Sequence, residues 1–103
     1  MHFVVDSKRE EVAALCRRLG VRRLEVFGSA ARGEDFDEAT SDVDFLVVLP
    51  DAQITSPLES YFGLKDQLET LLGRQVDLVS EGSVRNPYVL AAINRDRQLV
   101  FAG

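Results

Sequence analysis

Two aspartates separated by one residue, Asp42 and Asp44, have the types and the spacing to do chemistry. They stand at the start of an apolar run (VDFLVVL, residues 43–49) that predicts a β-strand, and side chains two apart in a strand project from the same face. Two carboxylates held so close repel each other, and a divalent cation with oxygen ligands, Mg²⁺ above all, relieves that repulsion. Taken alone, the same spacing also suits two ordinary exposed acids at a solvated strand start.

A Gly-Ser pair, Gly28 and Ser29, ends an earlier apolar run (VRRLEVF) that predicts another strand. Glycine lets a bound group approach the backbone closely, while serine offers a hydroxyl and an amide to an anion. Arg32 follows, and it either steadies a phosphate or pairs with Glu34 or Asp35. The segment is therefore a candidate anion-binding turn, although a lone Gly-Ser pair is also an ordinary strand-ending turn.

A third acid, Asp77, lies between Val76 and Leu78 in an otherwise apolar segment that predicts a further strand. A carboxylate buried in such a strand needs a partner, because leaving it unpaired is costly, whereas on an edge strand it can face solvent. If this strand lies beside the one that carries Asp42 and Asp44, the three carboxylates converge.

The elements that must position these residues alternate between helix and strand. We expect a helix that begins with a capping box formed by Ser7 and Glu10 and stops at Gly20, a second between Pro57 and Gly73, and a third that starts at Asn86-Pro87. The strands are expected at 21–27, 43–49, 76–80 and 98–102, with a loop and one helical turn in residues 28–41. This order predicts an α/β (α+β) domain in which a short mixed β-sheet is packed by helices.

Apolar residues at helical spacing predict which helix faces are buried. The second helix has a stripe made of Leu58, Phe62, Leu64, Leu68, Leu71 and Leu72, and the last helix has an inner face made of Val89, Leu90 and Ile93. We expect Cys16 to lie in the core, Tyr61 and Tyr88 to pack, and the terminal His2 to be disordered.

The composition excludes several classes of protein. The chain of 103 residues is long enough for one domain, spanning 1–103, and 46% hydrophobic with 28% charged residues rules out wholesale disorder. A single cysteine excludes an internal disulfide and a CxxC-type metal site. No apolar run approaches a membrane span and no signal-peptide pattern opens the chain, so we expect a cytoplasmic protein without membrane contact. The net charge of −5 disfavours nucleic acid as a partner.

Four segments together make the chain resemble the nucleotidyltransferase superfamily, and within it the small minimal nucleotidyltransferases. They are GSAARG (28–33), SDVDFLVVL (41–49), VDLV (76–79) and RNPYVLAAI (85–93). The resemblance implies the nucleotidyltransferase fold, with Gly28 and Ser29 holding the triphosphate of ATP. It also implies two Mg²⁺ ions bound by Asp42 and Asp44, with Asp77 completing the site as metal ligand, general base or both.

The resemblance further implies transfer of AMP to a partner protein. In the minimal family this activity belongs to the antitoxin of a toxin–antitoxin pair, and the acceptor is a tyrosine of a HEPN-domain toxin. The twelve residues between Ser29 and Asp42 exceed the roughly ten usual for this motif, and the surplus falls in residues 35–40. We expect the acidic stretch 34–38 to rim the site, with acceptor recognition supplied by this loop, by a partner or by a second copy of the chain.

The alternative is a binding module of another class, which neutralises its partner by occlusion while its active site is vestigial. The presence of all three acids and of Gly28 and Ser29 argues against that alternative.

Overall fold

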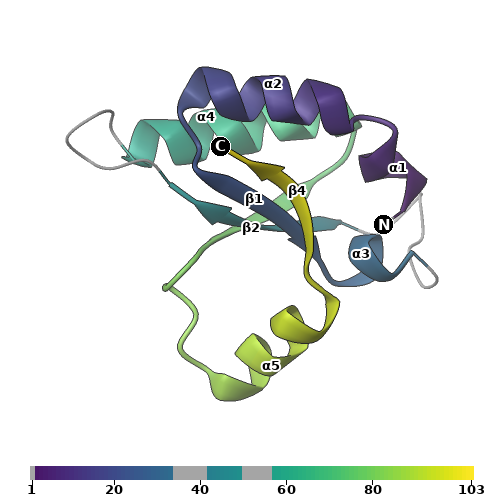
Figure 1. The fold of residues 1–103 in the computed structure, drawn as a ribbon, viewed down its shortest axis with the longest axis vertical. Helices are drawn as coiled ribbons and strands as arrows, with labels where there is room; N and C mark the ends of the chain where they lie inside the picture. The colour runs from purple at the N-terminus through teal and green to yellow at the C-terminus, as the bar shows by residue number, and fades with distance from the viewer. Residues whose placement is uncertain (1, 34–41, 50–56) are drawn as a thin grey trace.

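Four strands form one mixed sheet in the order β3-β2-β1-β4 (Figure 1). The computed structural model describes residues 2–33, 42–49 and 57–103. The strands are β1 (Arg23–Phe27), β2 (Val43–Val48), β3 (Val76–Ser80) and β4 (Gln98–Ala102). Strand β1 is antiparallel to both β2 and β4, whereas β2 and β3 are parallel. The predicted mixed sheet and its four strands are therefore confirmed.

The helices of the described segments cover the two sheet faces unequally. They are α1 (Phe3–Asp6), α2 (Arg9–Leu19), α3 (Ser29–Arg32), α4 (Pro57–Leu72) and α5 (Pro87–Asp96). Helices α2 and α4 lie side by side over one face, α5 lies on the other side, and α3 follows the end of β1 (Figure 1). None of the helices described is long and apolar enough to cross a membrane.

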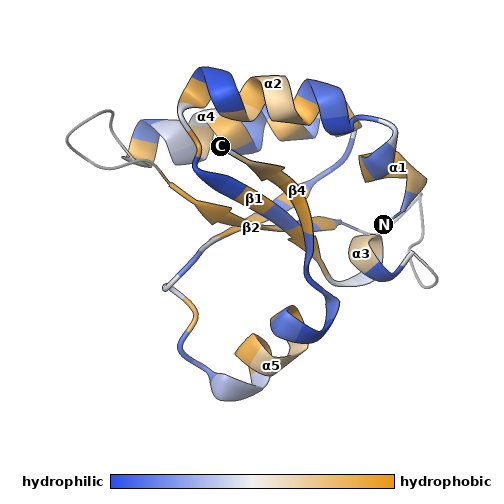
Figure 2. Cartoon of the chain, in the orientation of Figure 1, coloured by the Kyte–Doolittle hydropathy of each residue, from blue (hydrophilic) through white to orange (hydrophobic). Residues whose placement is uncertain are grey.

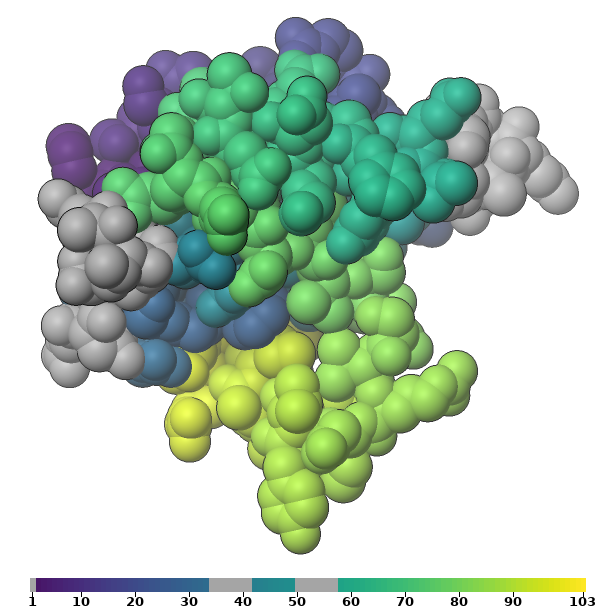
Figure 3. Space-filling view, turned by 180° about the vertical axis from the view of Figure 1, so that it is seen from behind, coloured from purple at the N-terminus to yellow at the C-terminus, as the bar shows by residue number. Residues whose placement is uncertain are grey.

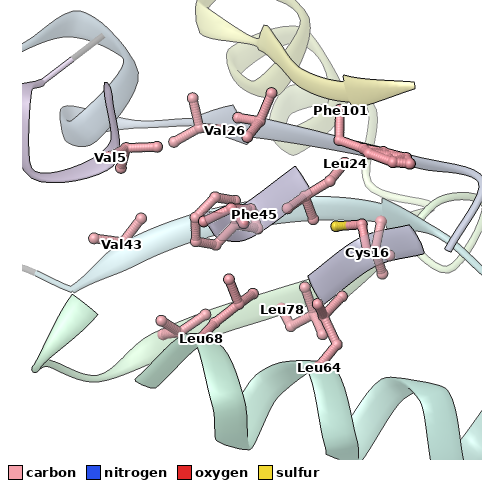
Figure 4. Packing of buried hydrophobic residues seen from close by; sticks show 14 of the residues in the cluster. Val5, Cys16, Leu24, Val26, Val43, Phe45, Leu64, Leu68, Leu78 and Phe101 are labelled. Atoms are coloured by element: carbon pink, nitrogen blue, oxygen red, sulfur yellow. The ribbon is translucent and has the colours of Figure 1, made fainter. Parts of the chain in front are cut away.

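The hydrophobic core fills the space between the sheet and helices α2 and α4 (Figure 4). Alternate residues of β2 are fully buried there, and Cys16 joins them from α2, as predicted. The largest fully buried side chains include Phe45, Leu24, Leu64 and Leu68. In Figure 2, strands β2 and β4 are mostly hydrophobic, whereas β1 and helix α2 alternate between hydrophilic and hydrophobic residues.

The predicted start of the first helix is wrong. Ser7 does not cap α2 but is the C-cap of α1, a short helix that was not anticipated from the sequence. Lys8 occupies the N-cap position of α2 and makes no side-chain capping bond. The capping-box pattern failed because the preceding turn was already helical, whereas the predicted end at Gly20 is confirmed.

His2 belongs to the fold, contrary to the expectation of a disordered terminus. Its Nδ1 accepts a hydrogen bond from the Val4 amide at 3.1 Å, which caps α1. Its own amide donates to the Ala30 carbonyl at 2.6 Å. The N-terminal segment is therefore tied to α3, the helix that follows the Gly-Ser pair.

Two helices bury less than their apolar patterns predicted. In α4, Leu64, Leu68 and Leu72 are buried, but Leu58 is 66% exposed and Phe62 is also exposed. Periodicity identifies an apolar face and does not tell whether another element covers it. Tyr61 packs as expected, because its hydroxyl donates to the Leu78 carbonyl at 2.6 Å.

In α5, only Ile93 is buried, so the prediction for Val89 and Leu90 is wrong. Tyr88 is 85% exposed and does not pack as expected. The predicted start is confirmed, because the Asn86 side chain accepts from the Tyr88 amide at 2.9 Å. The C-terminal end of α5 contacts the rest of the molecule, whereas the first turns of this helix are uncovered.

Burial of Cys16 leads to a first prediction. Burial raises the pKa of its thiol to about 12, against a smaller opposing effect of the Arg17 charge. Since the thiolate is the reactive form, a thiol reagent at about pH 8 should modify the native protein far more slowly than free cysteine. Added urea should accelerate labelling in step with unfolding followed by circular dichroism. Labelling of the folded protein at the rate of free cysteine would contradict the buried position.

Candidate active site

The register between two parallel strands brings Asp44 and Asp77 together. Strands β2 and β3 pair so that these two residues are direct partners, which places their backbones roughly 4.8 Å apart. Side chains alternate along a strand, and the neighbours Val43 and Val76 are buried in the core. Asp44 and Asp77 therefore lie next to each other on the opposite face of the sheet, the side on which α5 lies.

Helix α4 holds the backbone on both sides of Asp77. The Val76 amide donates to the Glu69 carboxylate at 3.1 Å, and the Leu78 carbonyl accepts from the Tyr61 hydroxyl at 2.6 Å. Neither contact was anticipated from the sequence. Together they fix β3 at the residue that faces Asp44.

The Asp44 carboxyl has an unfavourable environment for its charged form. Its pKa is raised to about 6, mainly by burial and then by a hydrogen bond and a like charge from Asp77. The charge of Asp42 adds to the increase, and that of Arg32 opposes it. A cation bound between the two carboxylates would relieve the repulsion between their charges.

The carboxylates of Asp42, Asp44 and Asp77 are suitable ligands for a hard divalent cation, although the three are not arranged around a single metal position. Carboxylate oxygens are the ligands that Mg²⁺ prefers. Among the described residues, no three acidic, histidine or cysteine side chains are already arranged to hold a metal ion. Asp42 precedes β2 and is exposed, so its side chain can change rotamer readily. Asp44 and Asp77 thus form a preformed pair to which Asp42 can add a ligand.

Gly28 lies directly against Asp44. It has φ 71° and ψ −152°, a conformation open essentially to glycine. A Cβ atom at this position would be 2.6 Å from Oδ2 of Asp44, so a side chain here would have to displace that carboxylate. Ser29 follows as the first residue of α3. The backbone of the Gly-Ser pair therefore passes close to Asp44, so a group bound at the turn would lie beside this carboxylate.

Arg32 has a partner that was not anticipated from the sequence. Its Nη1 lies 2.5 Å from Oδ2 of Asp96, the last residue of α5, and the Asp96 side chain is 9% exposed. The two residues are 64 positions apart, so no local pattern could signal the pair. The alternative partners Glu34 and Asp35, and the whole acidic stretch 34–38, lie outside the described residues.

Comparison with known proteins identifies the family to which this chain belongs. Residues 9–100 match the family of nucleotidyltransferase domains. Two Methanocaldococcus jannaschii proteins named as protein adenylyltransferases, MJ0128 and MJ1379, are 36% and 40% identical over 93 residues, which is 90% of either chain. The protein adenylyltransferase MntA of Thermococcus cleftensis is 43% identical over 72 residues, covering 70% of this chain and 68% of its own. The chain is accordingly a nucleotidyltransferase.

Comparison with solved structures shows which form of the nucleotidyltransferase fold the chain has. A solved structure described as a minimal nucleotidyltransferase is 38% identical, has a TM-score of 0.72 and covers 95% of both chains. The chain belongs to the nucleotidyltransferase domain family and has the minimal form of its fold. The resemblance to the minimal nucleotidyltransferases is therefore confirmed.

Two more distant structures share the fold. One is a toxin–antitoxin complex with AMP-PNP, at 19% identity and a TM-score of 0.65, and it covers 92% of this chain and 73% of the other. The second is an MNT antitoxin in complex with a tri-AMPylated HEPN toxin of Shewanella oneidensis, at 16% identity and a TM-score of 0.61. It covers 95% of this chain and 72% of the other. At these identities the match concerns the fold alone.

Replacing Asp44 with asparagine should stabilise the metal-free protein near neutral pH. A carboxyl whose pKa is raised from 3.8 to about 6 on folding contributes stability below about pH 4 and loses it as the pH rises to about 6. The amide that replaces the carboxyl stays neutral, so Asp44→Asn should raise the melting temperature in EDTA at about pH 7.5 and leave it nearly unchanged at about pH 4. Asp66→Asn, on the exposed side of α4, makes the same charge change as a control. A fall of many degrees at the higher pH would make Asp44 a structural residue.

Gly28→Ala should remove ATP binding because its Cβ meets the Asp44 carboxylate. Gly73→Ala is the matched control, since Gly73 has a similar φ of 67° but nothing within 4 Å of an added Cβ. Both variants should lose about 1–3 kcal/mol of unfolding free energy from backbone strain. Calorimetry with ATP and Mg²⁺ should then show binding by Gly73→Ala and none by Gly28→Ala. Equal binding by the two variants would remove Gly28 from the nucleotide site.

Proposed function

We propose that this protein transfers AMP from ATP to a hydroxyl, that of a tyrosine, on a partner protein, in a reaction that requires Mg²⁺. The observation that carries the proposal is the pairing of Asp44 with Asp77, with Gly28 packed against Asp44. It occurs in a chain 36% to 43% identical to proteins named as protein adenylyltransferases. The proposal treats residues 1–103 as one nucleotidyltransferase domain that acts in the cytoplasm, where ATP is available.

Each candidate residue has a distinct role in this proposal. Gly28 and Ser29 hold the triphosphate through backbone and hydroxyl contacts, and Arg32 offsets part of its charge. Asp42, Asp44 and Asp77 would hold two Mg²⁺ ions. When bound, these ions supply positive charge to the triphosphate and lower the pKa of the acceptor hydroxyl.

The reaction is an in-line displacement at the α-phosphorus. The acceptor oxygen forms a bond to this atom, the bond to the oxygen that bridges to the β-phosphate breaks, and pyrophosphate leaves with that electron pair. Asp77 is the more exposed acid of the pair and lies on an edge strand, so a hydroxyl brought by a partner can reach it. We assign to the Asp77 carboxylate the acceptance of the hydroxyl proton.

The proposed acceptor is a HEPN-domain toxin, which makes this chain an antitoxin. Support comes from the 43% identity to MntA and from the fold shared with MNT antitoxins in complex with HEPN toxins. The net charge of −5 suits a basic protein partner better than nucleic acid. Binding of the toxin would make the active form a hetero-oligomer.

The test combines the protein with ATP, Mg²⁺ and a HEPN-domain protein encoded beside it. Intact-mass spectrometry should show the partner gaining one or more AMP units, and peptide mapping should place them on tyrosine. Asp42→Asn and Asp44→Asn should abolish the gain, whereas Asp66→Asn should retain it. If the complex silences the partner with no gain in mass, occlusion is the mechanism and the proposal is wrong.

A further inference from the structure

Helix α4 protects one outer edge of the sheet, that of strand β3. Its side chains bind two backbone groups of this strand, the Val76 amide and the Leu78 carbonyl. A further strand would need these groups for its own hydrogen bonds. In the view from behind, α4 lies nearest the viewer across the upper part of the molecule (Figure 3). The β3 edge is therefore protected against the addition of another strand.

The other outer edge, that of strand β4, is less protected in the described residues. Strand β4 ends the sheet, and no described strand pairs with its outer side (Figure 1). Arg9 of α2 donates to the Leu99 carbonyl at 3.3 Å, which is a long bond between exposed groups. The register with β1 skips Val100, and a bulge leaves its extra residue out of the ladder. This edge can therefore accept an added strand.

A hollow of about 460 Å³ lies between this edge and helix α2. It is lined by Val100 of the strand and by Arg9, Glu10, Ala13 and Arg17 of the helix. Side chains of an added strand would enter the hollow, because they project from the two faces of a sheet. The lining contains both charge signs, so the surface that fits it must carry both as well.

Contacts between α2 and β4 determine how the helix lies along the strand. Arg9 bonds to the Leu99 carbonyl, and the Arg17 guanidinium lies 5.8 Å from the centre of the Phe101 ring. The helix therefore runs in the same direction as the strand. Its middle, at Ala13, lies beside the middle of the strand.

We propose that this face binds a second copy of the chain about a two-fold axis beside Ala13. The two β4 strands then lie antiparallel, and the two α2 helices lie side by side. Glu10 is three residues before Ala13, and Arg17 is four residues after it. The axis therefore places Glu10 of each copy opposite Arg17 of the other, so the interface contains this ion pair twice.

The width of the helix layer fits a sheet that continues through the axis. Neighbouring strands lie about 4.8 Å apart, so two strands span about 10 Å, which is the diameter of one helix. Helix α4 contacts β3 and helix α2 contacts β4, so two helices cover four strands. Two copies would form eight strands under four helices, with the small residue Ala13 where the two α2 helices approach. The acid pair near the β3 edge stays open in this dimer.

Charge reversal tests the proposed ion pair. Glu10→Arg and Arg17→Glu should each raise the dissociation constant of the dimer at least about tenfold in sedimentation velocity, because each places like charges opposite one another. An equimolar mixture of the two variants should form heterodimers, since both pairs then regain opposite charges. The two residues are two turns apart on one helix, too far for a direct contact within one chain to explain this rescue.

Matched controls come from the side of α2 that faces α4. Glu11 and Arg18 line the hollow between these two helices, so Glu11→Arg and Arg18→Glu make the same charge changes away from β4. Both should leave the dimer unchanged. Where circular dichroism shows that a reversal prevents folding, Glu10→Gln and Arg17→Gln replace it and should also weaken the dimer. In the unmodified protein, amides of residues 98–102 should exchange hydrogen more slowly as the protein concentration rises.

The inference goes beyond the proposed function, and the two can fail separately. A protein that stays monomeric at all concentrations would overturn the dimer, as would a dimer that withstands both reversals or variants that fail to form heterodimers. Protection of the β4 amides only after addition of a HEPN-domain protein would assign this edge to that partner and also overturn it. A protein that dimerises as expected but transfers no AMP contradicts the proposed function alone.

Discussion

The parallel register of β2 and β3 is the constraint on which the site depends. It makes Asp44 and Asp77 direct partners, and a slip of one residue would turn Asp44 into the core and expose Val43. Parallel neighbours cannot be joined by a tight turn and need a crossover connection, which here includes α4. Leu64 and Leu68 anchor that helix to the core. Packing on one face of the sheet therefore sets the chemistry on the other.

That arrangement keeps two acids in contact at a cost to stability. The raised pKa of Asp44 expresses the cost, since folding brings the carboxyl into partial burial beside Asp77. Asp77 is held beside Asp44, because Glu69 and Tyr61 hydrogen-bond to the backbone on either side of Asp77. Locally unfavourable charge in a well-packed framework is typical of a functional site.

Local patterns were enough to predict the strands, including those that carry Asp44 and Asp77, and most helix boundaries. The alternation in β2 and the stop at Gly20 depend on residues close together in sequence. The pair between Arg32 and Asp96, and the exposed first turns of α5, depend on where elements meet in space. Ser7 shows the same limit at short range, because the short helix before it had no sequence pattern strong enough to predict.

The strand order also suggests how two substrates reach one phosphorus atom. Asp44 lies on β2, with the Gly28 turn after β1 on one side and Asp77 on the edge strand β3 on the other. In an in-line displacement the attacking and leaving oxygens lie on opposite sides of phosphorus. In the proposed reaction, pyrophosphate held at the Gly28 turn would leave the side of Asp77 to the acceptor hydroxyl. Because β3 is the edge strand, its outer edge is where the proposed protein acceptor can approach Asp77.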